Sequence, residues 1–577
     1  MNRAIASLRR LLALPLVAAL LGPSACTTGG KQARPPLEGG AVASASSDAT
    51  AVGLATLQVG GNAVDAAVAT ALALAVVHPE AGNLGGGGFA VGRASGELFA
   101  LDFRETAPAA ATPTMFLDAD GRPVSERSLV GPLAAGVPGS PRGLWELHRR
   151  FGRLPWREVV RPAVRLAREG FLLSTREAGA IAAEVELLRR FPETAAVWLP
   201  GGAPPRGGTR VRLPRLAALL EDYGERGPDA VVTGEAARAI EGASRRWGGV
   251  LTAADLAAYR PVWREPVRFS TFGWEVASMP LPSSGGIILG ETCLMLERLG
   301  WATLPRGGAE GVHLLVEVWR RAYADRVLLG DPATTAATEQ DLLDPRWLVR
   351  RAAEIPRDRA TPSAELRSWS PGAAAERLET THLSVVDSDG NAVALTTTLN
   401  GSFGCGLLVP ELELLLNNEM DDFAAAPGTP NLYGLVQGEA NAVGPGKRML
   451  SSMTPTVAWR GGEIVALGSP GGSRIPTATA QVLLALLLDG SSLQVAVDRP
   501  RLHHQWLPDE VLFEAGAIDP AAAQQLAALG HHLVARGKLG EVHAARRLVD
   551  GRLEAAADRR GPGSAAVWLP SARAARP

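Results

Sequence analysis

The sequence predicts a globular protein of mixed α and β structure, and three segments carry this prediction. Residues 63–77 are almost all apolar and follow a capping pair, Asn62 and Asp65, which indicates a buried helix. Residues 380–400 are two alternating, β-branched segments around a turn-forming run, which indicates a hairpin. Residues 464–488 read as strand, glycine turn and helix. The chain of 577 residues is longer than a single hydrophobic core usually supports, so we expect two domains or one large body with long excursions.

The composition is that of an ordinary globular protein. The apolar fraction is 46%, the charged fraction is 20% and the formal net charge is −1. We find no basic stripe with interleaved aromatic residues, so nucleic acid is not an expected partner. Beyond Cys26 only Cys293 and Cys405 remain, which supply neither a disulfide framework nor a zinc site.

The N-terminal region is predicted to be an export signal followed by a tether. Arginines precede the apolar run 11–21 and small residues follow it, so residues 1–25 are interpreted as an export signal rather than a membrane span. Cys26 leaves two interpretations of equal weight: a lipoprotein signal with lipid on this cysteine, or an ordinary secretory signal cut nearby. Residues 27–45 are interpreted as a flexible tether, with order beginning near Ala51. We therefore expect an exported protein of the periplasm or cell envelope.

The hairpin has a predictable register. If Val386 pairs with Ala392 across the loop, Thr380 falls opposite Thr398, and opposed Cβ atoms lie roughly 4.5–5.5 Å apart. One face is then apolar, with Leu383, Val385, Val393 and Leu395. The other is polar or small, with Thr380, His382, Ser384, Thr396 and Thr398. These hydroxyls form either a functional cluster or an incidental result of the preference of threonine for strands.

Several other segments allow a simple structural interpretation. The chain from 131 to 369 is predicted to be mainly helical and contains no motif that dictates chemistry. The glycine run 85–88 lacks the strand-to-helix context of a nucleotide loop and indicates a close backbone approach in the core. Ser283 and Ser284 lack a nucleophile elbow and are interpreted as a turn that leads into a helix. Residues 357–379 are interpreted as a linker into the hairpin.

Three segments after the hairpin have the composition of a binding site. A strand predicted at 412–416 ends in the run 417–423, whose three carboxylates and two amides need a cation, a metal or solvent. Residues 427–447 contain one aromatic residue, Tyr433, and suit a lid. The strand, turn and helix of 464–488 point backbone N–H groups at one place, which suits an oxyanion or another anion. A phosphate site is the competitor, which the missing Gly-Lys-Ser/Thr ending disfavours.

Together these segments resemble the γ-glutamyltranspeptidases, a family of N-terminal-nucleophile (Ntn) hydrolases. The resemblance covers most of the chain beyond the export signal. Its motifs are GGNAVDAAVA at 60–69, HPEAGNLGGGGF at 78–89, LDFRETAP at 101–108, TTHLSVVDSDGNAVALTTTLN at 380–400, LLNNEMDDF at 415–423, LSSMTPT at 450–456 and GSPGGSR at 468–474. It implies an α+β fold, the four-layer αββα sandwich of two stacked, largely antiparallel sheets flanked by helices.

The resemblance also implies self-cleavage between Glu379 and Thr380, giving a large subunit of residues 46–379 and a small subunit of residues 380–577 within one body. A free α-amine on Thr380, with a pKa of ~7.7–8, can act as the base for the hydroxyl of the same residue. The implied reaction cleaves the γ-glutamyl bond of glutathione and related compounds through an ester on Thr380. Water, an amino acid or a peptide then accepts the group. The implied chemistry uses no cofactor or metal, and His503 and His504 are interpreted as structural.

The remaining site residues are assigned by the resemblance alone. Thr398 would orient the nucleophile, and Gly471 and Gly472 would supply oxyanion-hole N–H groups. The residues implied to bind the α-carboxylate of a γ-glutamyl group are Arg104, Ser451 and Ser452. Those implied to bind its α-ammonium group are Asp422, Asn400 and Glu419. Tyr433 would be the lid tyrosine that contacts the position of Asn400.

One departure from the family pattern and two alternative functions remain. Glu413 stands where relatives often have glycine, which puts the geometry near Glu419 in question. The resemblance extends to cephalosporin acylases, whose pocket accepts glutaryl groups without an α-amine, although Arg104, Asp422 and the tyrosine-bearing lid favour γ-glutamyl. From another class, the chain could be an unprocessed lipoprotein that only binds amino acids or peptides.

Overall fold

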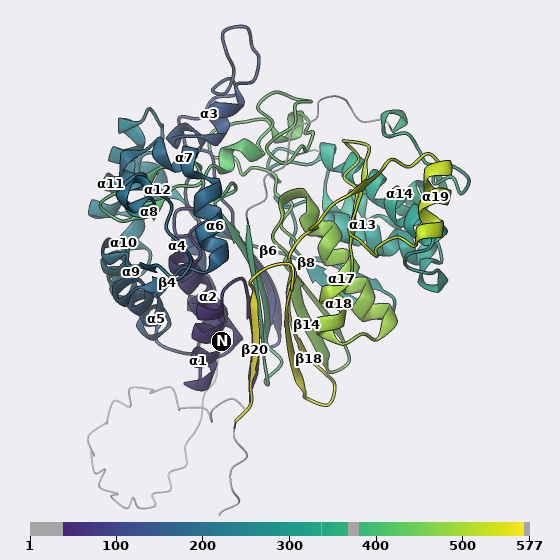
Figure 1. Ribbon diagram of the computed structural model, residues 1–577, viewed down its shortest axis with the longest axis horizontal. Helices are drawn as coiled ribbons and strands as arrows, with labels where there is room; N and C mark the ends of the chain where they lie inside the picture. The colour runs from purple at the N-terminus through teal and green to yellow at the C-terminus, as the bar shows by residue number, and fades with distance from the viewer. Residues whose placement is uncertain (1–38, 336, 367–379, 571–577) are drawn as a thin grey trace, which may run out of the picture. The chain divides into compact units, whose positions relative to one another are not determined.

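The computed structural model describes residues 39–335, 337–366 and 380–570, which belong to one compact unit spanning Pro36–Pro577. Two antiparallel sheets lie face to face in this unit, and helices cover the outer face of each sheet (Figure 1). This is the α+β, four-layer αββα sandwich that the resemblance implies. The export signal, Cys26, Glu379 and most of the predicted linker lie outside the described residues.

The first sheet has seven strands in the order β20-β1-β9-β10-β2-β3-β6. Their bounds are β1 Gly40–Ser44, β2 Gly87–Ala94, β3 Glu97–Phe103, β6 Val262–Arg264, β9 Thr381–Asp387, β10 Ala392–Thr398 and β20 Ser564–Trp568. In the hairpin β9–β10, Val386 pairs with Ala392 and Thr381 pairs with Thr397. The predicted register is therefore confirmed, and it brings Thr380 and Thr398 to the open end of the hairpin.

The second sheet has six strands in the order β19-β18-β14-β13-β8-β7. Their bounds are β7 Val267–Thr271, β8 Trp274–Ser278, β13 Thr456–Arg460, β14 Glu463–Gly468, β18 His543–Arg547 and β19 Leu553–Ala557. Residues 131–369 are mainly helical, as predicted, but they also contain the strands β6 to β8, which the sequence analysis did not identify. Strand β6 has only three residues and pairs with the distant strand β3. Strands β7 and β8 instead form a hairpin around Phe272 and Gly273, and β7 alternates between buried and exposed residues, so a local signal for this hairpin was present and was missed.

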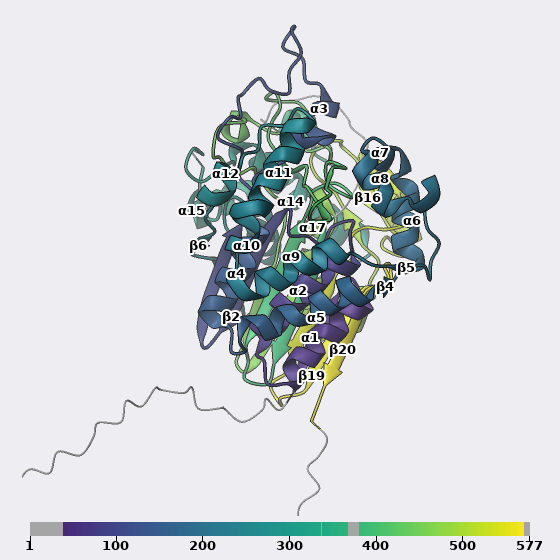
Figure 2. The same cartoon turned by 90° about the vertical axis from the view of Figure 1, so that its left-hand side faces the viewer.

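The helices outside the first sheet centre on α2 (Figure 2). They are α1 Ser47–Gln58, α2 Ala63–Val77, α4 Ser140–Phe151, α5 Trp156–Glu169, α9 Pro214–Arg226, α10 Asp229–Val232, α11 Gly234–Arg246 and α12 Ala253–Ala258. Helix α2 packs on β9 and β10 and also contacts α1, α4 and α5, which explains its apolar surface on all sides. Its bounds and its capping box at Asn62 and Asp65 are as predicted. Asp387 of the hairpin turn accepts a hydrogen bond from the Ala63 N–H (2.9 Å), which joins the turn to the helix.

The helices outside the second sheet include the helix that follows the glycine turn. They are α13 Gly285–Arg298, α14 Ala309–Asp325, α15 Glu339–Leu342, α16 Pro345–Ala353, α17 Ile475–Asp489, α18 Leu493–Asp498 and α19 Pro520–Ala528. Helix α17 is the predicted helix, slightly longer at both ends. Helix α13 begins one residue after Ser284, as the interpretation of that serine pair as a turn requires. Among the described residues no helix has the length and apolarity needed to cross a membrane.

Shorter elements connect these layers. They are α3 Ser125–Leu129, α6 Thr175–Ala183, α7 Val185–Arg189, α8 Pro192–Trp198, β4 Phe171–Leu172, β5 Arg210–Val211, β11 Leu408–Val409, β12 Leu414–Leu415, β15 Leu502–His503, β16 Val511–Phe513 and β17 Leu533–Ala535. The strand predicted at 412–416 is thus reduced to two residues. Glu413, directly before it, has a left-handed φ of 50°, which breaks the extended conformation.

The period-two alternation of the hairpin separates two cores. Leu383, Val385, Val393 and Leu395 pack with the helices outside the first sheet. Val386, Ala392 and Ala394 pack between the two sheets. His382 lies on this second face and is fully buried, with hydrogen bonds to Thr396 (2.8 Å) and Ser384 (3.0 Å). The predicted polar face is therefore part of the interior and leads to the site at the end of the hairpin.

The predicted tether is wrong for residues 40–45, since β1 begins at Gly40 and order precedes Ala51. Strand β1 lies between β20 and β9 in the first sheet. A Cβ atom on Gly40 would lie 2.5 Å from Leu57 Cδ1 of α1, so a residue without a side chain is needed there. Small residues at this point reflect close packing, which their composition alone does not distinguish from a linker.

Candidate active site

One cavity at the open end of the hairpin collects almost all the residues assigned from the sequence. Ten of the eleven predicted catalytic and substrate-binding residues line it, and Gly471 is the one that does not. The ten are Arg104, Thr380, Thr398, Asn400, Glu419, Asp422, Tyr433, Ser451, Ser452 and Gly472. They come from both sides of position 380, so the site is assembled from both of the expected subunits.

The strand ends around Thr398 are held by backbone and amide hydrogen bonds. Thr398 Oγ1 accepts a hydrogen bond from the Asn400 N–H (2.8 Å), and the carbonyl oxygen of Thr398 accepts one from Asn83 Nδ2 (2.7 Å). A Cβ atom on Gly86 would lie 2.1 Å from that carbonyl oxygen. The glycine run therefore provides the close backbone approach that was predicted, and it fixes the position of β10 beside Thr380.

A buried charge cluster forms the opposite side of the cavity. Arg104 follows β3, and its guanidinium group pairs with Glu419 Oε1 and with Asp422 Oδ2 (2.5 Å). Asp422 Oδ1 also accepts a hydrogen bond from Asn431 Nδ2 (2.8 Å). All three charged side chains are buried. The residues implied to bind a carboxylate and an ammonium group thus lie side by side, with one guanidinium group paired to two carboxyl groups.

Burial changes the protonation of these carboxyl groups. It raises the pKa of Glu419 and of Asp422, while the charge of Arg104 acts in the opposite direction. The neighbouring Glu105 is also fully buried, and its pKa rises to about 7. Within the described part of the chain, Glu419 Oε2 and Ser452 Oγ are buried without a hydrogen-bond partner. Both residues line the cavity, so these atoms can form hydrogen bonds with a bound molecule.

The turn between β14 and α17 brings Gly472 to the cavity. Gly471 and Gly472 have φ values of 126° and 54°, which are favourable only for glycine. A Cβ atom on Gly472 would lie 2.3 Å from Tyr433 Cδ1. The Tyr433 hydroxyl donates to the carbonyl oxygen of Asn400 (2.7 Å), the contact that the resemblance implies. Tyr433 is therefore fixed between the glycine turn and the end of the hairpin.

Sequence reasoning missed an apolar wall and one buried arginine. Leu435, Met453 and Ile475 also line the cavity, and nothing in their local pattern distinguishes them from core residues. Arg326 is buried at the end of α14, where it donates through Nε to Ser284 Oγ (3.1 Å). Burial lowers its pKa to about 10, while the charge of Asp422 acts to raise it. An arginine at a helix end is ordinarily exposed, so the sequence contains no signal for this position.

Glu413, the departure from the family pattern, has a clear structural role. Its side chain accepts hydrogen bonds from the N–H groups of Arg215 (2.9 Å) and Leu216 (3.4 Å) at the start of α9. The residue caps this helix while adopting the left-handed backbone that glycine would adopt without strain.

Two histidine groups outside the cavity form hydrogen bonds with other protein groups. His503 bonds to Thr477 (2.8 Å) and Gln505 (2.9 Å), and His504 bonds to Asp509 (3.3 Å), in agreement with a structural role. His313, Glu317 and His531 lie close enough to share a metal ion. However, His313 already bonds to His531 and to the Pro356 carbonyl oxygen, and Glu317 pairs with two arginines.

Comparison with known proteins identifies relatives over nearly the whole chain. The family model described as γ-glutamyltranspeptidase matches residues 49–568. A glutathione hydrolase proenzyme of Escherichia coli is 43% identical over 527 residues, which are 90% of this chain and 90% of that protein. An acylase ACY 1 proenzyme of a Pseudomonas species is 37% identical over 527 residues, covering 89% of this chain and 91% of that protein.

The solved structures that resemble this one also include an acylase and a γ-glutamyltranspeptidase. The crystal structure of cephalosporin acylase from Bacillus halodurans superposes with a TM-score of 0.81 at 25% identity, covering 95% of this chain and 99% of that one. The crystal structure of Helicobacter pylori γ-glutamyltranspeptidase has a TM-score of 0.55 at 36% identity. It covers 56% of this chain but 93% of its own, so the solved chain is little more than half as long as this one.

Proposed function

The chain belongs to the γ-glutamyltranspeptidase family, and we propose that it cuts itself before Thr380 and then hydrolyses or transfers the γ-glutamyl group of glutathione and related compounds. The observation that carries the proposal is the single cavity that joins Thr380 and Thr398 to the buried group of Arg104, Glu419 and Asp422. A nucleophile and a charged recognition group thus share one small site.

Activation starts in the uncut chain, where the nitrogen of Thr380 is an amide and has no basicity. The Thr380 hydroxyl attacks the carbonyl carbon of Glu379, the C–N bond breaks, and the acyl group moves from nitrogen to oxygen. Water hydrolyses this ester and leaves a carboxylate on Glu379 and a free α-amine on Thr380. The term proenzyme for the curated relatives and the half-length chain of the solved one both support a cut precursor.

In the mature site, the α-amine takes the hydroxyl proton as Thr380 Oγ attacks the γ-carbonyl carbon of the substrate. The resulting oxyanion accepts hydrogen bonds from the N–H groups of Gly471 and Gly472. The C–N bond breaks, the ammonium group of Thr380 returns the proton to the leaving amine, and a γ-glutamyl ester remains. Water or an acceptor amine gives a proton to the α-amine, attacks the ester, and regenerates the hydroxyl as the C–O bond breaks.

Substrate recognition follows from the charges in the cavity. The α-carboxylate of the substrate binds Arg104 with Ser451 and Ser452, since a planar guanidinium fork suits two carboxylate oxygens. The α-ammonium group binds Asp422, Asn400 and Glu419. Binding therefore exchanges the internal ion pairs of Arg104 for pairs with a zwitterion, which keeps every buried charge compensated.

The acylase relatives support a second candidate, hydrolysis of glutaryl amides. A glutaryl group has no α-ammonium group, so Glu419 and Asp422 would gain no cationic partner from the substrate. The carboxyl excess of the cavity favours the γ-glutamyl group. We further propose that residues 1–25 direct export to the periplasm or cell envelope, with or without lipid on Cys26.

The first test is the state of the purified protein on denaturing electrophoresis. We expect two fragments that meet at Thr380, and we expect Thr380→Ala to remain uncut and inactive on a γ-glutamyl anilide. A cut Thr380→Ala protein would contradict the assignment of the nucleophile. A single intact and inactive wild-type chain would favour the binding-protein alternative.

The second test concerns recognition of the ammonium group. We expect Asp422→Asn to lose activity on the γ-glutamyl anilide because the substrate ammonium loses a charged partner. Cleavage of a glutaryl anilide by the wild type at the same rate would favour the acylase instead.

A further inference from the structure

The loop 538–542, which precedes β18, contacts the glycine turn of the site directly. The Glu541 N–H donates a hydrogen bond to Ser469 Oγ (2.9 Å), and this hydroxyl donates to the Pro470 carbonyl oxygen (2.6 Å). A second contact runs from the Arg474 guanidinium group to the carbonyl oxygen of Lys538 (3.2 Å). The loop therefore supports the turn on both sides of Gly471 and Gly472.

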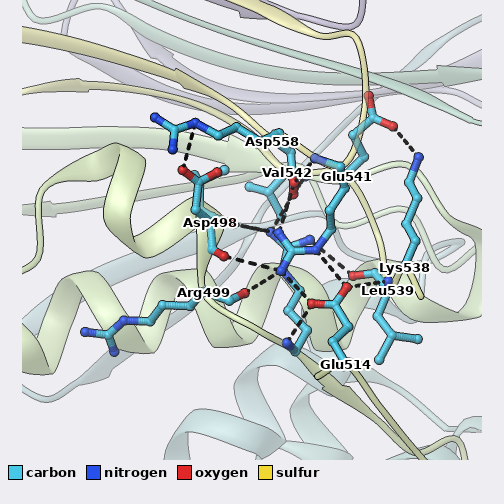
Figure 3. Close-up of polar contacts among 12 residues, drawn as sticks. Asp498, Arg499, Glu514, Lys538, Leu539, Glu541, Val542 and Asp558 are labelled. Atoms are coloured by element: carbon cyan, nitrogen blue, oxygen red, sulfur yellow. Dashed lines mark hydrogen bonds and ion pairs between the residues drawn. The ribbon is translucent and has the colours of Figure 1, made fainter. Parts of the chain in front are cut away.

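The backbone of this loop is held by side chains of the expected small subunit, mainly by carboxylates (Figure 3). The Leu539 N–H donates to Glu514 Oε1 (2.7 Å), and the Val542 N–H donates to Asp558 Oδ2 (3.0 Å). Arg501 donates to the Leu539 carbonyl oxygen (3.1 Å). All these partners follow position 380, so they belong to the expected small subunit.

The Glu541 side chain points instead to the expected large subunit. Its Oε2 atom pairs with Arg176 Nη1 of α6 (2.7 Å) and with Lys538 Nζ (2.6 Å). Arg176 also pairs through Nε with Glu80 Oε1 (3.1 Å), just after α2. The carboxylate groups of Glu541 and Glu80 are each 2% exposed, whereas Arg176 is 26% exposed. One arginine thus joins two buried carboxylates, one from each expected subunit.

The ion pair of Glu541 and Arg176 holds a carboxylate charge in a buried position, which costs free energy unless the charge is paired. Burial acts to raise the pKa of Glu541, but the charges of Arg176, His543 and Lys538 hold it at about 2. Without Arg176, Glu80 and Glu541 would both lose a cationic partner. Glu541 would keep Lys538, whose side chain is 43% exposed. A buried carboxylate that loses one of its charged partners is less stable in place, so we expect Glu541 to shift with Lys538 and to draw its loop away from Ser469.

We propose that Arg176 is a positioning residue for the reaction: through Glu541 it holds loop 538–542 against the glycine turn, so that the large subunit sets the geometry of an oxyanion site built in the small subunit. This role rests on the proposed function. None of the lining residues of the cavity is Arg176 or Glu541, so both act through other groups.

The test is a set of variants assayed with a γ-glutamyl anilide. The oxyanion contacts form in the transition state, so Arg176→Met is expected to lower kcat by about two- to tenfold with little change in KM. Arg176→Lys keeps a charge and should recover part of the loss. Glu541→Gln should match Arg176→Met, and the double variant should lose no more than either single variant, because both interrupt the same connection.

The control is Arg168→Met, which breaks an ion pair with Glu221 in which both side chains are about half exposed (54% and 53%). It should keep the wild-type kcat. The proposal is wrong if Arg176→Met also keeps it, if KM rises while kcat stays constant, or if the losses of the two single variants add in the double variant.

A second measurement does not depend on activity. Hydrogen–deuterium exchange of the segment 468–474 should be faster in Arg176→Met and Glu541→Gln than in the wild type and in Arg168→Met. Unchanged exchange in both variants would overturn the proposal. If the wild type cleaves no γ-glutamyl anilide, the proposed function fails, while the exchange data still decide whether Arg176 controls the turn. If Arg176→Met does not fold, Arg176→Lys and Glu541→Gln give the same comparison.

Discussion

Replacement of Gly472 by alanine tests the geometry of the oxyanion turn. The left-handed φ of 54° costs a residue with a Cβ atom roughly 1–2 kcal/mol. The new Cβ atom would also lie 2.3 Å from Tyr433 Cδ1 and 2.5 Å from Cε1, well inside the roughly 3.5–4.0 Å of an ordinary carbon contact. Tyr433 is 4% exposed and is held by its hydroxyl at Asn400, so the ring cannot move away without breaking that bond.

Either the turn or the ring must therefore shift by about 1 Å, a displacement that breaks the alignment of an oxyanion donor. We expect Gly472→Ala to lower kcat by about 10²–10³, the loss measured when one such donor is removed. The assay is the initial rate on a γ-glutamyl anilide per mole of cut enzyme, with the cut fraction measured by denaturing electrophoresis. This normalisation separates catalysis from self-cleavage.

Gly461 provides the matched control, because its φ is 60° and a Cβ atom there would have no neighbour within 4 Å. Gly461→Ala carries the same backbone strain without the overlap, so it should lose stability but keep its kcat. A kcat of Gly472→Ala within twofold of that of Gly461→Ala would refute the argument that the turn and Tyr433 are mutually fixed.

Two further predictions concern stability. Glu413→Ala should destabilise the protein by about 1 kcal/mol, because it removes the cap of α9 and keeps the left-handed backbone. Glu413→Gly relieves the backbone strain, so its thermal unfolding should be closer to that of the wild type. The opposite order of the two variants would contradict the assigned role of Glu413. Burial lowers the pKa of His504 and His543 to about 4, from an ordinary 6.5. Between pH 6.5 and pH 4 the unfolded chain binds more protons than the folded chain. The buried histidines should therefore not reduce the free energy of unfolding above about pH 6.5, and should reduce it increasingly as the pH falls towards 4. His543→Leu should flatten this decline in thermal unfolding, whereas the same change at the exposed His532 should not; equal slopes would exclude His543 as a cause.

Much of the site was predictable because its parts are local. The register of the hairpin follows from a period of two and a short turn, and the structure confirms it up to the pair Thr381 and Thr397. Thr380 and Thr398, the next residues along, line the same cavity. Helix α2 was predicted to the residue because its cap and its apolar length are both encoded in sequence. The resemblance identified the cavity residues, and the structure brings ten of the eleven together.

The errors occur where partners are distant in sequence. The small residues of β1 were interpreted as a tether, although they fit a narrow position beside α1. Strand β6 has only three residues and pairs with β3, far earlier in the chain. The hairpin β7–β8 is an exception, because its strands pair across a two-residue turn and its alternation was overlooked. The capping role of Glu413 depends on a helix some two hundred residues earlier, and no local rule predicts such a contact.

The sequence by itself determined the hairpin with Thr380 at its open end, the capped helix beneath it and the family to which the chain belongs. These rest on short-range patterning and on long, specific motifs. Only the tertiary structure decided that Arg104 pairs with Glu419 and Asp422, that Arg326 lies buried behind them, and that Arg176 contacts Glu541. Charged side chains far apart in sequence acquire their partners only when the two sheets pack, and burial then sets the energy of each pair.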